Sequence, residues 1–319
     1  MSEQQDLFAE LMPKPALKHV ERLQKVQEGL AERLYLGTTS WSNEDWEGLI
    51  YPQGCPSQDY LEHYAKVFRM VEVDTTWYRI PSRKMIDGWL GRTPERFTFA
   101  AKVPRVVSHE KKLVDCVGER EEFLEAMRPL GERLGPLVMQ FGYVARGQDE
   151  QEHETGAEFI GRLDRFLEEV PTGEFRLAVE VRNGKWLRPE LIEVLKRHRV
   201  GLVLNSYYTM PDIGELVEQI DPVTADFIYV RFLGDRRRMD EHVAALIESG
   251  EKQRHWDQLV WDRKAELQRW VGNLQKLTRR HPEREIFALF NNHYAGYAPG
   301  SLGMFARAWK GRSEGSSGG

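Results

Sequence analysis

The segment RMVEVDTTWY, residues 69–78, contains the pattern that decides the fold. Val71 and Val73 alternate in it with Glu72 and Asp74. Because the side chains of a β-strand repeat with period two, the valines lie on one face and the acids on the other. The apolar face predicts packing against helices, and the acidic face predicts an interior lined by ionisable groups.

Seven further segments are short, apolar and followed by turn residues and then by a charged segment with helical periodicity. They cover residues 34–41, 97–105, 135–142, 175–183, 200–206, 226–234 and 284–292. Eight strands alternating with helices over roughly 250 residues predict a closed (β/α)₈ TIM-like barrel. An open doubly wound sheet is the structural alternative, but GTTSWSN after the first strand lacks the GxGxxG phosphate turn of such sheets.

The chain divides into three parts. Residues 1–33 predict an N-terminal helical extension, because apolar residues recur at spacings of three and four in PALKHVERLQKVQEGLAERL. Residues 34–310 form the predicted barrel, and the Gly/Ser-rich residues 311–319 predict a flexible tail. The stretch from Gly234 to Arg284 is too long for one helix and predicts an insertion after the seventh strand. Whether the extension or the insertion acts as a lid is left open.

Composition limits the classes of function. The chain has 319 residues, 41% hydrophobic content and a formal net charge of -5. This balance disfavours nucleic-acid binding through bulk charge but leaves a local basic groove open. Cys55 and Cys116 are too few for a disulfide framework and lack metal-ligand spacing. There is no apolar run of about 18 residues and no secretory signal, so we expect a cytoplasmic protein without membrane contact.

The active site of such a barrel lies at the carboxyl ends of its strands. With the valines of VEVD and AVEV facing the helices, the charged residues of the same strands point into the barrel. A buried charge is costly unless it is paired, so we expect acids and bases of several strands to converge. These residues are Glu72, Asp74, Lys102, Glu180, Arg182 and Arg231. A salt-bridge network that only holds the barrel together is the competing interpretation.

The strand ends and the following loops supply the candidate site. The predicted catalytic residues are Glu72, Glu180, Lys102 and His109. The predicted substrate-binding residues are Ser40, Trp41, Asp74, Tyr78, Gln140, Arg182, Trp186, Arg231, Asn291, Asn292 and His293. No metal ligands are predicted, because imidazoles and thiolates are too sparse for a transition-metal site. The cofactor is left unassigned, and Mg²⁺ held by the acids Glu72, Asp74 or Glu180 stays open.

Two sets of loop residues carry weaker signals. The aromatic residues at the strand ends either pack the loops or wall a pocket for a sugar ring or a base. The run from Arg236 to Arg238 follows the seventh strand, where many barrels bind phosphate, although a solvated charge run is the commoner explanation.

Several motifs together resemble the domain of unknown function 72 family. They are LGTTSWSNEDWEGLIYP, VEVDTTWYRIPS, FTFAAKVPRVVSHEKKL, LGPLVMQF, AVEVRNGKW, TADFIYVRFLGD and FNNHYAGYAP, in this order within residues 34–310. The resemblance implies a TIM-like barrel and does not supply a reaction. Pocket similarity has suggested a kinship of that family to metal-dependent apurinic endonucleases. His293 departs from the family pattern, which often has an acid after the paired asparagines.

Three functions are compatible with these observations. The first is an enzyme, a hydrolase or lyase, that uses acid/base residues on a small anionic, phosphorylated or carboxylated, sugar-like substrate. The second is nucleic-acid binding or metal-dependent phosphodiester cleavage, which requires a continuous basic track to the mouth. The candidate residues of that track are Arg105, Lys111, Lys112, Arg236, Arg237 and Arg238. The third is a non-catalytic ligand sensor.

Overall fold

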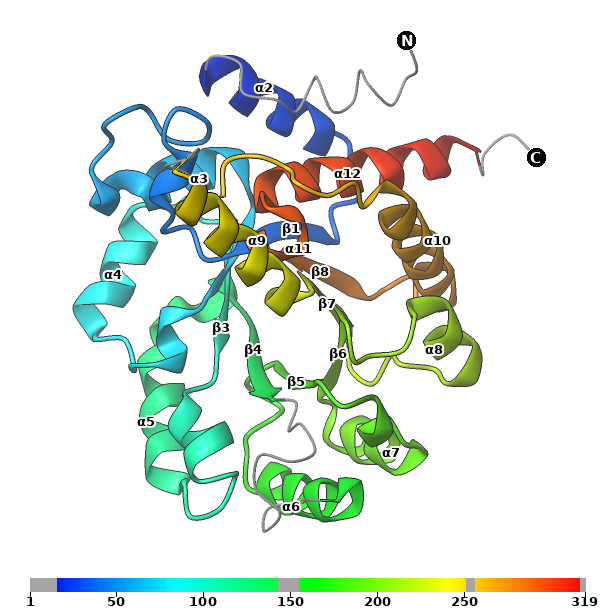
Figure 1. Ribbon diagram of the computed structural model, residues 1–319. Helices are drawn as coiled ribbons and strands as arrows, with labels where there is room; N and C mark the ends of the chain where they lie inside the picture. The colour runs from blue at the N-terminus through cyan, green and yellow to red at the C-terminus, as the bar shows by residue number, and fades with distance from the viewer. Residues whose placement is uncertain (1–15, 143–154, 251–255, 316–319) are drawn as a thin grey trace.

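The structure is a computed structural model that describes residues 16–142, 155–250 and 256–315. Eight parallel strands hydrogen-bond in chain order, and the first pairs with the last to close a barrel (Figure 1). They are β1 (Leu34–Thr39), β2 (Met70–Val73), β3 (Thr98–Lys102), β4 (Leu134–Phe141), β5 (Leu177–Val181), β6 (Gly201–Tyr207), β7 (Phe227–Gly234) and β8 (Glu285–Phe290). The predicted (β/α)₈ barrel is confirmed, and the open sheet is excluded.

The helices lie around the barrel and over one of its ends (Figure 1). They are α2 (Ala16–Gln27), α3 (Tyr60–Val67), α4 (Arg83–Gly91), α5 (Val117–Met127), α6 (Gly156–Glu168), α7 (Pro189–His198), α8 (Ile213–Gln219), α9 (Arg236–Ser249), α10 (Lys264–Arg280), α11 (Asn292–Ala295) and α12 (Ala298–Gly315). Helix α6 shows why these segments are helical. Thr155 and Glu158 form a reciprocal capping box at its start, and Phe159, Leu163 and Phe166 form its buried stripe.

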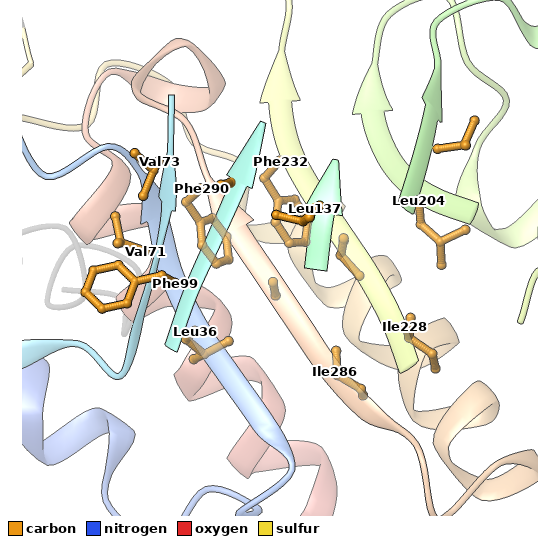
Figure 2. Close-up of a cluster of buried hydrophobic side chains, with 14 of the residues drawn as sticks. Leu36, Val71, Val73, Phe99, Leu137, Leu204, Ile228, Phe232, Ile286 and Phe290 are labelled. Atoms are coloured by element: carbon orange, nitrogen blue, oxygen red, sulfur yellow. The ribbon is translucent and has the colours of Figure 1, made fainter. Parts of the chain in front are cut away.

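The main hydrophobic core lies between the strands and the helices. Figure 2 shows outward-facing side chains of neighbouring strands, including Val71 and Val73 of β2 and Phe290 of β8. Val179 and Val181 of β5 belong to the same core. The two valine faces therefore meet the helices, as the alternating pattern predicts.

A second, smaller core fills the barrel itself. It contains Met70, Ala100, Val138, Ala178, Val203, Phe227, Tyr229, Phe287 and Leu289. Two residues further along their strands, Glu72, Glu180 and Arg231 form the next inward-facing layer, since alternate residues share a face. The apolar layer separates these charges from the amino end of the barrel, so the carboxyl end is the side where a site can form.

Strands β2 and β3 end earlier than the sequence predicts. The Thr76 hydroxyl lies 2.9 Å from the Val73 carbonyl oxygen and 2.8 Å from the Lys102 carbonyl oxygen, so its single proton is shared between these two acceptors. The hydroxyl thus links the last carbonyls of both strands, and the chain turns into a 3₁₀-helix, η3 (Thr75–Trp77). After β3 the chain forms a π-helical turn, η4 (Val106–Glu110), which carries His109.

The insertion predicted after the seventh strand is present. Two helices, α9 and α10, separate β7 from β8, and α9 lies against α11 (Figure 1). The segment between them is anchored beside the first loop. The Trp46 indole donates to the Trp256 carbonyl at 3.0 Å, and the Trp256 amide donates to the Asp45 carboxylate at 3.0 Å. The insertion is thus tied to the rim of the barrel rather than projecting from it.

Both chain ends differ in detail from the sequence prediction. Helix α2 confirms a helix within residues 1–33, but residues 1–15 lie outside the described part. Helix α12 continues to Gly315, so the sequence prediction places the start of the tail, at residue 311, too early. Residues 316–319 lie outside the described part. Of the helices in the described ranges, none combines the length and apolar character needed to cross a bilayer.

A buried histidine fastens α2 to the barrel. His19 is 1% exposed, and its Nε2 lies 2.8 Å from the Tyr297 hydroxyl, just before α12. Burial, supported by the charge of Arg22, lowers the pKa of His19 to about 4 from 6.5. The folded protein therefore holds this imidazole neutral at pH 7.

We predict that His19→Gln makes the protein less sensitive to acid. The unfolded chain protonates His19 below about pH 6.5, whereas the folded protein resists until about pH 4, so folding stability falls as the pH falls through this window. Between about pH 7 and pH 4 the free energy of unfolding should drop by roughly 3 kcal/mol more in the wild type than in the variant. Urea unfolding at each pH measures this difference, and parallel pH profiles would contradict it.

Candidate functional site

Arg231 of β7 lies between two buried carboxylates at the carboxyl end of the barrel. Its Nη2 lies 2.7 Å from Glu72 Oε1, and its Nη1 donates to Glu180 Oε2. The side chains of Arg231 and the two acids are 1%, 0% and 0% exposed. The Tyr229 hydroxyl donates to Glu72 Oε2 at 2.8 Å. Chain-distant strands thus bring their charges together, as the sequence predicts.

The two acids of this layer differ in their ionisation. Burial raises the pKa of Glu72 above its usual value, against the opposing charge of Arg231. Burial would also raise the pKa of Glu180, but the charges of Arg231 and Arg182 and their hydrogen bonds outweigh it and lower the pKa to about 2. A carboxylate with so low a pKa is a weak base and stays ionised at neutral pH. This argues against the proton-transfer role predicted for Glu180, which instead positions two arginines.

Arg182 and Lys102 form the layer nearer the solvent. Arg182 Nε donates to Glu180 Oε1 at 2.6 Å and its Nη2 donates to Gln140 Oε1 at 2.9 Å. Lys102 Nζ lies 2.8 Å from Asp74 Oδ1. Each of these two cations is 15% exposed. The mouth therefore presents two cations that are accessible and held in place.

His109 stands beside these cations on the π-helical turn η4. Its Nδ1 lies 2.8 Å from the Ser108 hydroxyl, and its ring meets the Trp77 ring edge-on at 5.3 Å. Burial lowers the pKa of His109, and the positive charges of Arg105, Arg182 and Lys102 add to the effect. The imidazole is therefore neutral at pH 7 and able to accept a proton.

The loop after His109 is strained. Lys112, Leu113 and Asp115 have φ angles of 48, 67 and 47°, in the left-handed region that side chains other than glycine rarely adopt. Each such residue costs on the order of 1 kcal/mol and persists only where the surroundings enforce it. Both π-helical turns and strained residues concentrate at functional sites, so the backbone supports a role for His109.

The β1 and β8 side of the mouth holds a small uncharged pocket of about 150 Å³. Its lining includes Thr39, Ser40, Ser42, Asn43, Trp256 and Asn292. Hydroxyl, amide and aromatic groups of this kind suit a ligand fragment with hydroxyl groups. Ser40 takes the left-handed conformation at φ 79°, which turns the chain away from β1 at the pocket.

The asparagines and the histidine after β8 have largely structural partners. Asn291 Oδ1 accepts the His293 amide at 2.8 Å as the cap of α11, and Asn292 Oδ1 accepts the Ala298 amide at 2.9 Å. His293 Nδ1 lies 2.7 Å from Asn291 Oδ1, and its Nε2 lies 3.1 Å from Asp240 Oδ1 of α9. Both ring nitrogens of His293 already have a hydrogen-bonding partner, so His293 is a poor candidate for a general base. Its contact with Asp240 of α9 connects the insertion to the mouth.

The predicted aromatic residues do not form one wall. Trp41 meets Trp89 of α4 edge-on at 5.9 Å and packs against the outer core. Trp186 is 8% exposed and stacks on Phe159 of α6 at 4.4 Å. Tyr78 is 72% exposed at the rim. Sequence position at a strand end therefore does not distinguish aromatic rings that pack loops from those that face the mouth.

Two tyrosines of the site are absent from the sequence prediction. Tyr229 donates to Glu72, and the guanidinium of Arg182 lies 4.7 Å from the centre of the Tyr207 ring. A signal existed for Tyr229, because it lies two residues before Arg231 and shares its inward face. Tyr207 has no such signal, since a shift in register separates Asn205 from Tyr207 in the pairing of β6 with β7.

The carboxylates at the mouth do not fit a Mg²⁺ site. Glu72 and Glu180 pair with Arg231, and Asp74 pairs with Lys102, so each of the three carboxylates already has a cationic partner. Within the described residues there is no group of three or more His, Cys, Asp or Glu that could hold a metal ion.

The basic track required for nucleic acid is interrupted by acids. Arg105 pairs with Glu110 at 2.9 Å and Lys111 with Glu119 at 2.6 Å. On α9, the arginines at 236 and 237 pair with the acids four residues on, at 3.4 and 3.0 Å. Such exposed pairs add little stability but cancel local charge. The geometry therefore disfavours the nucleic-acid alternative.

We predict that Arg231→Met strongly destabilises the fold. It removes the guanidinium that pairs with the buried Glu72 and leaves the buried Glu180 with Arg182 alone, which should lower the free energy of unfolding by roughly 3–5 kcal/mol. The triple variant Glu72→Gln, Glu180→Gln and Arg231→Met removes the charges together and should recover most of the loss. Urea unfolding of both variants tests this, and a triple variant no more stable than Arg231→Met would contradict the role of charge compensation.

Comparisons with known proteins agree with the fold and the motifs. The family model described as "Protein of unknown function DUF72" matches residues 35–317. UPF0759 protein YecE of Escherichia coli K12 is 33% identical over 153 residues, which are 48% of this chain and only 50% of YecE. UPF0759 protein YunF of Bacillus subtilis is 24% identical over 274 residues, 83% of this chain and 90% of YunF. A DUF72 family crystal structure from Thermotoga maritima has a TM-score of 0.63 and 26% identity, covering 88% of this chain and 99% of that chain. The family match spans nearly the whole barrel, and this chain belongs to the DUF72 family.

Proposed function

We propose that this protein is an enzyme that binds a small anionic, sugar-like compound at the barrel mouth and acts on it by acid/base chemistry, as a hydrolase or lyase. The observation that carries the proposal is the pair of positioned, accessible cations, Arg182 and Lys102, beside the neutral imidazole of His109. The phosphate or carboxylate group of the ligand binds these cations. His109 acts as a general base that accepts a proton during the reaction, and the cations stabilise the negative charge that develops on the substrate.

The fixed orientation of Arg182 supports a role in binding the anionic ligand, beyond a role in balancing buried charge. Arg182 is held by Glu180, Gln140 and Tyr207, and its side chain is still 15% exposed. A guanidinium that is already oriented loses little entropy when it binds an anion. Buried ion networks are poor stabilisers compared with apolar packing, so stability alone does not account for building one here.

The uncharged pocket beside β1 and β8 supports the sugar-like part of the proposal. Hydroxyls of Thr39, Ser40 and Ser42 donate and accept hydrogen bonds, as the hydroxyl groups of a carbohydrate do. A volume of about 150 Å³ accommodates a fragment of a few carbon and oxygen atoms. The ligand therefore spans an uncharged pocket and a cationic centre.

We predict that Arg182→Met weakens binding of the anionic compound. Mass spectrometry of the purified protein identifies the compound retained, and titration then gives its affinity, with ribose 5-phosphate as the probe if none is retained. Loss of one charged contact should weaken binding by about 10- to 100-fold. Arg176→Met is the matched control, because Arg176 precedes the same strand, β5, at the opposite end of the barrel. Unchanged affinity in Arg182→Met would reject the proposed binding centre. Binding without turnover would indicate the sensor instead.

We predict that His109 titrates below pH 6.5 and that an anion at the mouth raises its pKa. NMR of the imidazole, assigned with His109→Asn, follows the titration with and without sulfate, which does not itself titrate near neutral pH. Because the bound anion favours the protonated imidazole, sulfate should bind more tightly as the pH falls, and His109→Asn should remove that dependence. A titration of His109 that sulfate does not move would place the anion elsewhere.

A further inference from the structure

Ser108 places a buried hydroxyl group against the imidazole of His109. The serine precedes the histidine on η4 and is 4% exposed. Its Oγ lies 2.8 Å from Nδ1 of His109, and this hydroxyl has no second partner in the described part of the chain. Buried hydroxyl groups generally form hydrogen bonds, and this one bonds to the imidazole of the proposed reaction centre. The contact therefore acts directly on His109.

The π-helical geometry of η4 makes this contact possible. Adjacent side chains of an α-helix do not face each other. In η4 the Lys111 amide donates to the Val106 carbonyl, five residues earlier, at 2.9 Å, so the turn is wider than that of an α-helix. Val107 and Ser108 are buried, whereas His109 is partly exposed. The wider turn thus brings two neighbouring side chains together, with the serine inside and the imidazole at the mouth.

The two ring nitrogens of His109 have different surroundings. Nδ1 lies against Ser108, whereas Nε2 has no hydrogen-bonding partner among the residues that the structure describes. A Cβ atom placed on Gly142 would lie 3.8 Å from Nε2, so this nitrogen lies beside the carboxyl end of β4. The Trp77 ring, edge-on at 5.3 Å, restricts rotation of the imidazole. The ring is therefore held at one nitrogen and open at the other.

We propose that Ser108 is a positioning residue, whose hydroxyl holds Nδ1 of His109 so that Nε2 is the nitrogen that faces the ligand and accepts its proton. In the neutral imidazole Nδ1 carries the proton and donates it to Ser108 Oγ, which leaves the lone pair on Nε2. When Nε2 takes a proton from the ligand, the bond from Nδ1–H to Oγ persists. A hydroxyl orients the ring without the large rise in pKa that a carboxylate in its place would cause. The role of Nε2 rests on the proposed function, whereas the hold on Nδ1 is testable without a ligand.

The test is NMR of the imidazole nitrogens in the full-length protein, with the signals of His109 assigned by their loss in His109→Asn. The chemical shifts of the two nitrogens report which of them carries the proton. At a pH above the titration of His109, the wild type should show predominantly the Nδ1–H tautomer. Ser108→Ala should change the ratio of the two tautomers by roughly 2- to 10-fold, which is the effect of losing one neutral hydrogen bond.

Two further variants separate positioning from a general effect on the fold. Ser108→Thr keeps the hydroxyl and should restore the wild-type ratio of tautomers. Ser301→Ala is the matched control, because Ser301 of α12 is 1% exposed and its hydroxyl donates to the Tyr297 carbonyl at 3.1 Å. It removes a buried hydroxyl that does not contact His109 and should leave the ratio unchanged.

Sulfate distinguishes failure of this inference from failure of the proposed function. Bound sulfate should shift the Nε2 signal of His109 and leave the Nδ1 signal nearly unchanged. A predominant Nε2–H tautomer in the wild type, a ratio that Ser108→Ala leaves unchanged, or a response to sulfate at Nδ1 alone would each overturn the positioning role. A ratio that depends on Ser108 while neither nitrogen responds to sulfate would support the hold on Nδ1 and reject the anion site of the proposed function.

Discussion

The arrangement of the mouth depends on one buried guanidinium. Arg231 compensates Glu72 and Glu180 where both acidic side chains are 0% exposed, and a buried carboxylate is costly without such a partner. The effect extends outward, because Glu180 uses its other oxygen to hold Arg182, and Gln140 accepts hydrogen bonds from both arginines. The position of the accessible cation is thus set by a chain of contacts that begins in the barrel interior.

The inward direction of the charges could be predicted from the sequence, but their depth could not. Alternation in VEVD and AVEV fixes which face Glu72 and Glu180 occupy, and the structure confirms it. Whether an inward residue is sealed or accessible depends on how the eight strands are staggered, which no single strand encodes. Glu180 and Arg182 belong to the same inward face, yet one is sealed and the other reaches the mouth. That difference argues against the catalytic role predicted for Glu180, whereas the role also predicted for His109 stays a prediction.

Loop residues were harder to interpret than strand residues, for a physical reason. Asparagines that cap helices and asparagines that bind ligands use the same amide groups in the same kinds of loop. The side-chain oxygens of Asn291 and Asn292 accept hydrogen bonds from backbone amides at the starts of α11 and α12. The polar sequence after β8 is therefore explained largely by helix geometry. Trp186 illustrates the same ambiguity, because its partner Phe159 lies on a helix that the strand pattern does not place beside it.

The charges of the site are ordered by depth, and this order decides what the mouth attracts. The formal charges of the six ionisable residues of the site sum to zero when all are charged, since there are three acids and three bases. These residues are Glu72, Asp74, Glu180, Lys102, Arg182 and Arg231. The sealed layer contains two acids and one base, whereas the accessible layer contains Lys102, Arg182 and the partly exposed Asp74. The outward side is therefore net positive although the set is neutral. Because burial raises the pKa of Glu72, protonation of that residue makes the whole set positive without changing the accessible layer. A protein of net negative charge can thus present a local attraction for anions at the mouth without any basic surface.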